Sequence, residues 1–143
     1  MHRTFFVVFS IGCLAAVPSC GGSSQGAASP EQAENHAAQE AVQAWLAALD
    51  AGNYEETWNQ SASVFRIGNG SPSTWANTAG EMRAPLGRVV SRRLKEAAPT
   101  NLQEGAAYAF AYDTSFEARP MSVEEVTVVL DGGFWKVAGY LVK

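Results

Sequence analysis

The spacing of apolar residues changes at Gly87, and this change constrains the fold more than any other feature of the sequence. Before Gly87, apolar residues recur at intervals of three and four, which is typical of amphipathic helices. After Gly87 they alternate with other residues at intervals of two, which is typical of strands. We therefore expect an α+β domain in which N-terminal helices pack on one face of a curved, four-stranded antiparallel sheet, a cone-like arrangement.

Three helices are expected before Gly87. Their ranges are Pro30–Ala51, Tyr54–Phe65 and Ser73–Met82. Ser29 is the expected N-cap of the first helix, Pro30 suits its first position, and Gly52 follows its end. The stretch 68–72 contains two glycines and a proline, so it separates the second helix from the third.

Four strands are expected after Gly87. Their ranges are Arg88–Lys95, Ala106–Glu117, Val123–Leu130 and Phe134–Val142. The sequence Asp-Gly-Gly at 131–133 is a strong hairpin signal between the last two strands. The stretch from Pro99 to Gly105 predicts a loop before the second strand.

The first 19 residues have the pattern of a secretory signal peptide. Arg3 precedes an uncharged apolar run from Phe5 to Val17. That run is shorter than the roughly 20 apolar residues that a membrane-spanning helix needs. The alternative is a buried N-terminal helix or strand, but the pattern favours a cleaved signal (residues 1–19) and export of the chain.

Cys20 follows this signal and is the expected site of a lipid anchor. The sequence Val17-Pro18-Ser19-Cys20 resembles a lipobox, with ordinary cleavage after Ser19 as the alternative. Cys13 would be lost with the signal, so Cys20 would be the only thiol of the mature chain. Gly21 gives no signal for retention at the inner membrane. We expect a periplasmic, outer-membrane-anchored lipoprotein, with a flexible Gly/Ser tether at 20–29 and a single domain at 30–143.

Charge and residue types exclude several classes of function. The chain has 10 basic and 14 acidic residues, and the signal carries one of the basic ones, so nucleic acid is not an expected partner. His36 is the only histidine after the signal, and we predict no metal site, no cofactor and no nucleophile–histidine pair. The doublets Glu55-Glu56 and Glu124-Glu125 are interpreted as solvated faces, and Asp50 as a surface or capping residue.

An ordered set of aromatic residues and turns resembles a bacterial family. The motifs are Trp45-Leu46, Asp50-x-Gly52-x-Tyr54, Trp58, Trp75, Arg83-x-Pro85-Leu86-Gly87, Ser91-Arg92 and Trp135-x-Val137-x-Gly139-Tyr140. From Ala41 to Lys143 they resemble domain of unknown function 4019. That family is similar to the cone-shaped folds of nuclear transport factor two and ketosteroid isomerase, and the resemblance implies a fold without fixing an activity.

Two sets of side chains are candidates for a site. Aromatic residues that line a pocket or fill the core are Trp58, Trp75, Tyr108, Tyr112 and Tyr140. Arg83 and Arg92 belong to a basic segment that ends at Lys95, and they are candidates for a structural or anion contact. Within the family pattern, Arg83 suits a buried ion-pair anchor for the turn from helix to strand. The alternative for the segment is a charged edge strand paired with the acidic first helix.

No convincing set of catalytic residues emerges, so the sequence favours a non-catalytic envelope domain. Such a domain would bind a partner protein or a small ligand, and its lipidated Cys20 would hold it at a membrane. The alternative is a small pocket enzyme of the ketosteroid-isomerase type, with a polar group inside the cone. A homodimer that pairs through the sheet face of Ala107, Ala109 and Ala111 is also left open.

Overall fold

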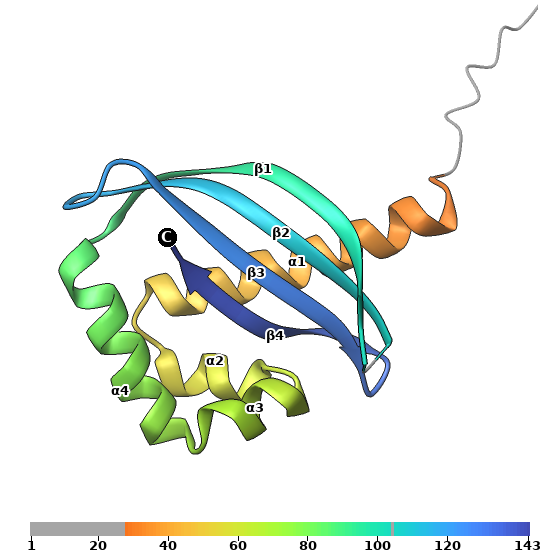
Figure 1. The fold of residues 1–143 in the computed structure, drawn as a ribbon, viewed down its shortest axis with the longest axis horizontal. Helices are drawn as coiled ribbons and strands as arrows, with labels where there is room; N and C mark the ends of the chain where they lie inside the picture. The colour runs from red at the N-terminus through yellow and green to blue at the C-terminus, as the bar shows by residue number, and fades with distance from the viewer. Residues whose placement is uncertain (1–27, 104) are drawn as a thin grey trace, which may run out of the picture.

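A computed structural model describes residues 28–103 and 105–143. The predicted signal, Cys20 and most of the predicted tether lie outside the described residues. The elements are α1 (Pro30–Asp50), α2 (Tyr54–Gln60), α3 (Ser63–Asn69), α4 (Pro72–Arg83), a 3-10 turn (Ala84–Leu86), β1 (Val89–Leu102), β2 (Gly105–Phe116), β3 (Ser122–Asp131) and β4 (Phe134–Val142). The predicted α+β class, with helices packed on an antiparallel sheet, is confirmed (Figure 1). None of the helices in the described ranges is long and apolar enough to span a bilayer.

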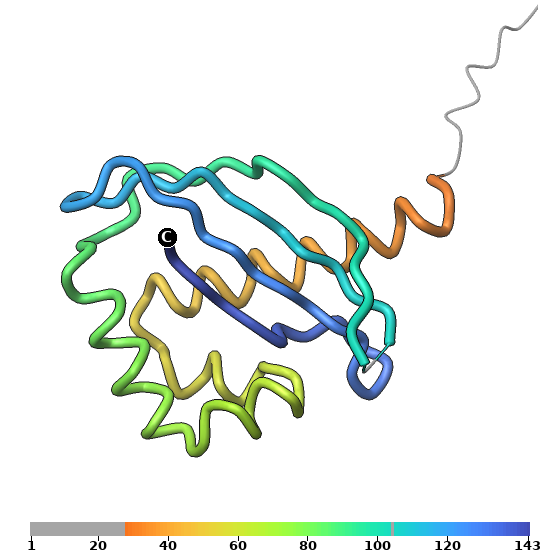
Figure 2. The backbone as a smooth tube through the Cα atoms, viewed as in Figure 1, coloured from red at the N-terminus to blue at the C-terminus, as the bar shows by residue number. Residues whose placement is uncertain are grey.

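The sheet is a meander in the order β1-β2-β3-β4, with every neighbouring pair antiparallel. It curves over the helices, and its two ends differ (Figure 2). The β1–β2 and β3–β4 turns lie at the end where α1 begins. The β2–β3 hairpin lies at the opposite end, near the end of α4.

The core lies between α1 and the inner face of the sheet. The apolar residues of α1 recur at three- and four-residue intervals, so they form one stripe along the helix. This stripe packs with inward-facing residues of β2, β3 and β4; core members that are almost fully buried include Val42, Trp45, Leu46, Leu49, Phe110, Val126, Val128 and Val137. Among residues 28–103 and 105–143, every buried hydrophobic residue lies between Ala38 and Val137, so a chain that starts within the tether retains them all.

The ends of the first helix follow the sequence prediction. The Ser29 hydroxyl accepts a hydrogen bond from the backbone N–H of Gln32 at 3.2 Å, and the Gln32 side chain accepts one from the Ser29 backbone at 2.9 Å. This capping box satisfies two N–H groups that would otherwise lack partners. At the other end Gly52 has a φ of +78°, which is typical of a residue that ends a helix.

The expected second helix is instead two helices. Ser61 and Ala62 have extended backbones, with ψ of 160° and 158°, and they separate α2 from α3. The Ala62 N–H donates to the Val137 carbonyl of β4 at 2.8 Å instead of continuing a helix. A contact with the edge strand therefore overrides the helical spacing.

The loop expected from Pro99 is mostly strand. β1 continues to Leu102, pairing Pro99 with Tyr108 and Leu102 with Gly105. Because β1 is an edge strand, Pro99 can occupy it without removing a hydrogen bond from the interior of the sheet. Register shifts between Val89 and Ser91 and between Leu94 and Glu96 make this edge irregular, which disfavours pairing with another strand.

Gly87 fixes the turn from the helices to the sheet. Its φ is +73°, and a Cβ at this position would lie 3.0 Å from the Cβ of Glu117. Only glycine fits both conditions without strain. The residue at which the apolar spacing changes is thus also the one that the turn requires.

Candidate functional site

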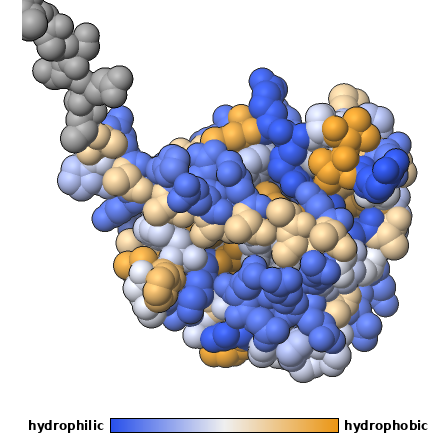
Figure 3. Space-filling view, turned by 180° about the vertical axis from the view of Figure 1, so that it is seen from behind, coloured by the Kyte–Doolittle hydropathy of each residue, from blue (hydrophilic) through white to orange (hydrophobic). Residues whose placement is uncertain are grey.

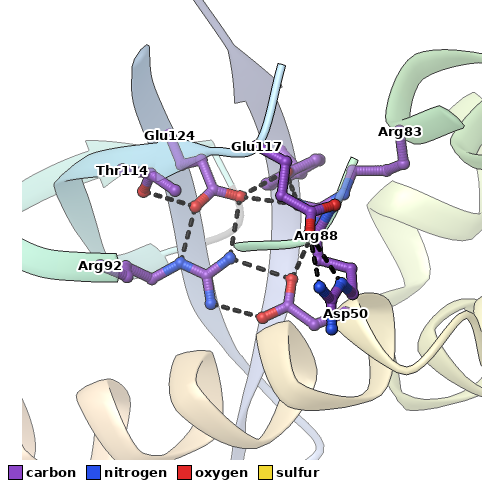
Figure 4. A network of polar contacts seen from close by, with 8 residues as sticks. Asp50, Arg83, Arg88, Arg92, Thr114, Glu117 and Glu124 are labelled. Carbon is purple, nitrogen blue, oxygen red and sulfur yellow. Dashed lines mark hydrogen bonds and ion pairs between the residues drawn. The ribbon is translucent and has the colours of Figure 1, made fainter. Parts of the chain in front are cut away.

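Four charged side chains meet where the helices end against the sheet, and we call them the ionic quartet (Figure 4). Asp50 is the last residue of α1, Arg83 is the last of α4, Arg92 lies on β1 and Glu124 lies on β3. The Glu124 side chain is 0% exposed and Arg83 is 5% exposed, whereas Asp50 is 28% exposed. The quartet therefore joins two helices and two strands at the border of the core.

Glu124 is the centre of the quartet and accepts five hydrogen bonds. Its Oε2 accepts from Arg92 Nε and from Thr114 Oγ1, both at 2.6 Å. Its Oε1 accepts from Tyr140 OH at 2.6 Å, Arg83 Nη1 at 3.0 Å and Arg92 Nη2 at 3.1 Å. A carboxylate offers about four lone-pair sites, so the acceptor capacity of Glu124 is filled.

Asp50 connects the same two arginines from the other side. Arg92 contacts both of its oxygens, with Nη1 at 2.7 Å from Oδ2 and Nη2 at 3.0 Å from Oδ1. Arg83 Nη2 donates to Oδ1 at 2.6 Å, and the Arg83 guanidinium lies 4.8 Å from the centre of the Phe116 ring. Two cations thus face two carboxylates. The bidentate geometry is the one in which arginine binds carboxylates most strongly.

Helix dipoles explain part of this arrangement. Arg83 ends α4, where the partial negative charge of a helix C-terminus favours a cation. Asp50 ends α1, where the same partial charge disfavours an anion. The two guanidinium groups offset that repulsion at the partly exposed Asp50 carboxylate.

Burial and charge determine the protonation of the groups around Glu124. Burial raises the pKa of Tyr140, and the neighbouring Glu124 carboxylate raises it further. Burial alone would lower the pKa of Arg83, but Tyr140 and the two carboxylates outweigh it and the net shift is upward. Tyr140 therefore stays a neutral hydrogen-bond donor, and Arg83 stays charged.

The quartet is suited to holding the fold together and poorly suited to proton transfer. A general base needs a free lone pair directed at its substrate. The oxygens of Glu124 are buried and already accept five donors. To act as a base, Glu124 would have to lose contacts that offset the cost of burying its charge.

The structure brings the two candidate arginines together and corrects the interpretation of one acidic residue, Glu124. Arg83 and Arg92 share both carboxylates of the quartet, as expected of structural contacts. The interpretation of Glu124 as a solvated residue is wrong, because its side chain points inward beside Thr114. Asp50 is an exposed residue, as expected, but two arginines hold its carboxylate, and the sequence did not predict this contact.

The rest of the basic segment pairs mainly with β2 and the residue that follows it, instead of with α1. Arg88 contacts Glu117 at 2.6 Å, and Arg93 contacts Asp113 at 2.9 Å. Lys95 lies 3.6 Å from the same Asp113. Asp50 is the α1 residue that pairs with this segment. The doublet Glu55-Glu56 is exposed, as expected.

The five candidate aromatic residues lie in or against the core. Trp75, Tyr108 and Tyr112 are buried, and Trp58 and Tyr140 pack against them with partial exposure. Trp75 Nε1 donates to Thr57 Oγ1 at 2.8 Å. Within the described ranges the Trp58 indole N–H and the Tyr112 hydroxyl are buried without a hydrogen-bond partner.

A groove of about 780 Å³ lies over the other face of the sheet, beside the β2–β3 hairpin. We call it the outer groove; its lining residues are Ser91, Arg92, Arg93, Asp113, Thr114, Ser115, Pro120, Met121, Ser122, Val123 and Lys143. Thr114 and Ser122 are buried on the inner face, so their sequence neighbours Ser115 and Val123 point outward. None of the five candidate aromatic residues lines this groove.

The alanine face that we considered for a homodimer is partly covered. Ala107 is buried against Ala62 and Val129 at the start of α3. Ala109 and Ala111 are half-buried. A smaller groove of about 210 Å³ lies beside this contact, between the start of α3 and the β3–β4 turn.

A family model described as a protein of unknown function, DUF4019, matches residues 41–140. The chain belongs to this family. The matched range includes the whole ionic quartet. It also includes every residue that lines the outer groove except Lys143. A comparison with curated proteins found no match. The similarity to cone-shaped folds that the sequence indicates stays a prediction.

Proposed function

We propose that this member of the DUF4019 family is a non-catalytic binding domain of the bacterial cell envelope. One observation carries the proposal. The two arginines and two carboxylates of the quartet pair with one another, whereas a groove of about 780 Å³ over the opposite face of the sheet is open to solvent. The interior charges therefore stabilise the fold, and the outer surface offers the space for a ligand or partner.

The alternative, a small pocket enzyme, requires a proton carrier inside the cone. Glu124 is buried and Asp50 lies at the border of the core, and both of these acidic candidates are bound by arginines. Tyr140 has a raised pKa and already donates to Glu124. These contacts favour the binding function over the catalytic one.

The proposed localisation in the envelope is supported by two features of the sequence. These are the export-signal pattern at 1–19 and Cys20 as the residue to be acylated. Each buried methylene of an acyl chain contributes about 0.8 kcal/mol, so several chains would hold the domain at a membrane. Metabolic labelling with an alkyne fatty acid tests this directly. The wild-type chain should carry the label in the membrane fraction, and Cys20→Ser should lose it. Label retained on Cys20→Ser would contradict anchoring at this residue.

Binding and catalysis are separated by a second experiment. Envelope extracts fractionated by size are screened by thermal shift and native mass spectrometry, with product formation followed in the same samples. We expect stabilisation by a component that is recovered unchanged. Multiple turnovers of a bound component into a product would contradict the non-catalytic assignment.

A further inference from the structure

Two exposed cations meet a single carboxylate beside the outer groove. Arg93 is 81% exposed and contacts Asp113, which Lys95 also approaches. Two cations therefore share one carboxylate, although the chain as a whole has a net charge of −4. Within residues 28–103 and 105–143, Arg93 donates one hydrogen bond, through Nη2. A guanidinium has five N–H donors, so Arg93 retains donors for an anion.

One wall of the same groove is apolar. Pro120, Met121 and Val123 line it, and the Met121 side chain is 91% exposed. Seen from behind, hydrophobic side chains gather beside strongly hydrophilic ones at the end of the molecule where the β2–β3 hairpin lies (Figure 3). Methionine is a flexible, polarizable side chain that adapts to ligands of irregular shape.

The floor of the groove adds polar, uncharged residues to its charged and apolar parts. Ser91 and Ser115 pair across β1 and β2 and both line the groove, two residues along each strand from Arg93 and Asp113. The volume of about 780 Å³ lies within the range of roughly 300–1,000 Å³ that small-molecule sites occupy. The groove thus combines a cationic part, hydroxyl groups and an apolar part at the scale of a small ligand.

We infer that the outer groove binds a small anionic amphiphile, a carboxylate or phosphate group joined to an apolar chain. The inference deepens the proposed binding function and rests on it. Arg93 binds the anionic group, assisted by Lys143, whose exposed ammonium pairs with Glu125 at 2.8 Å in the free domain. Met121 with Pro120 covers the apolar chain. The groove lies at the end of the sheet opposite the start of α1 (Figure 1). It faces away from the point where the tether joins the domain, which favours a free molecule over a headgroup of the anchoring membrane.

An NMR titration tests the inference with decanoate as the probe. Residues 20–143 with Cys20→Ser, labelled with ¹⁵N, are titrated below the concentration at which decanoate forms micelles. Saturable shifts are expected at the amides of Ser91, Ser115 and Val123. Arg93→Gln should weaken binding about tenfold, which corresponds to about 1.4 kcal/mol. Met121→Ser should weaken binding to a similar degree.

The control is Arg88→Gln, which removes an exposed arginine that pairs with Glu117 outside the groove. Its affinity for decanoate should equal that of the parent chain. Decyl phosphate should bind like decanoate, and decanol should bind at least tenfold more weakly. Equal binding of decanol, an unchanged affinity in Arg93→Gln, or binding to anionic vesicles without binding to free decanoate would each overturn the inference. Fatty-acid labelling of Cys20 and the absence of turnover are independent readouts, so a failure here is distinguishable from a failure of the proposed function.

Discussion

Replacing Glu124 by glutamine tests whether the ionic quartet holds the fold together. Glutamine preserves the size of the side chain but removes its charge and turns one acceptor oxygen into an NH₂ donor. Each Glu124 oxygen accepts from at least two donors, so either orientation of the amide places a donor against donors. Arg83 and Arg92 would then share the single carboxylate of Asp50.

The structure indicates a large loss of stability. Breaking a buried ion pair by removing one partner costs about 3–5 kcal/mol, because a buried charge is left uncompensated. A domain of this size is stable by about 6–15 kcal/mol, so the loss is a large fraction of the total. Glu124 is fully buried and contacts both arginines, which places the expected cost of Glu124→Gln within that 3–5 kcal/mol range.

The neighbouring residue provides the control. Glu125 points to the other face of β3 and pairs with Lys143 at 2.8 Å, both side chains being exposed. Exposed pairs of this kind contribute about 0–1 kcal/mol. Urea unfolding at neutral pH, in the Cys20→Ser chain of residues 20–143, gives the free energy of unfolding of each variant. If Glu124→Gln lies within 1 kcal/mol of Glu125→Gln, the quartet does not have the role assigned to it.

Three further predictions concern polar groups of the core and its border. Tyr140→Phe should lower the free energy of unfolding by about 1.5–3 kcal/mol because it removes a donor to a carboxylate, whereas Tyr112→Phe should leave it unchanged or raise it because that hydroxyl has no partner among the described residues; equal losses in urea unfolding would refute this contrast. Thr57→Val should cost about 1–3 kcal/mol because it leaves the Trp75 indole N–H unpaired, and a Trp75 indole NMR signal that does not move would argue against that hydrogen bond. The carboxylate of Asp131 accepts from the backbone and hydroxyl of the first α3 residue, and these bonds lower its pKa from 3.8. Its stabilisation is thus present above pH 3.8 and lost as the pH falls through the lowered value, so Asp131→Asn should unfold at lower urea than wild type at pH 7 and match it in strong acid; a gap that persists in acid would contradict the assignment.

Most of the fold was predictable because its signals are local. The Ser29 cap, the stripe of α1 and the Asp-Gly-Gly turn each depend on residues close together in the sequence. The wrong predictions concern segments whose conformation depends on residues far away in the sequence. Ala62 leaves the helix to pair with Val137, a strand residue far along the chain. Pro99 is tolerated in a strand because β1 lies at the sheet edge, which depends on the strand order.

The site was only half predictable for a related reason. Arg83 and Arg92 stand in recognisable positions, but their partners lie on other elements. Glu124 and Glu125 point to opposite faces of β3, and the same alternation that argues against a catalytic pair also requires one of them to face the core. Glu124 is in phase with the buried Val126, which was the available signal. The partners of Glu124 lie on other strands, so they could not be identified before the pairing of the strands was known.

The central claim is that ligands bind on the outer face while the buried quartet keeps its contacts. Side-chain NMR of the arginine Nε–H groups, recorded during the decanoate titration, tests this most directly. The Arg93 signal should shift saturably, and the Arg83 signal should stay protected from exchange and nearly unmoved. A shift or loss of protection at Arg83, with Arg93 unaffected, would place the ligand inside the fold and contradict the account.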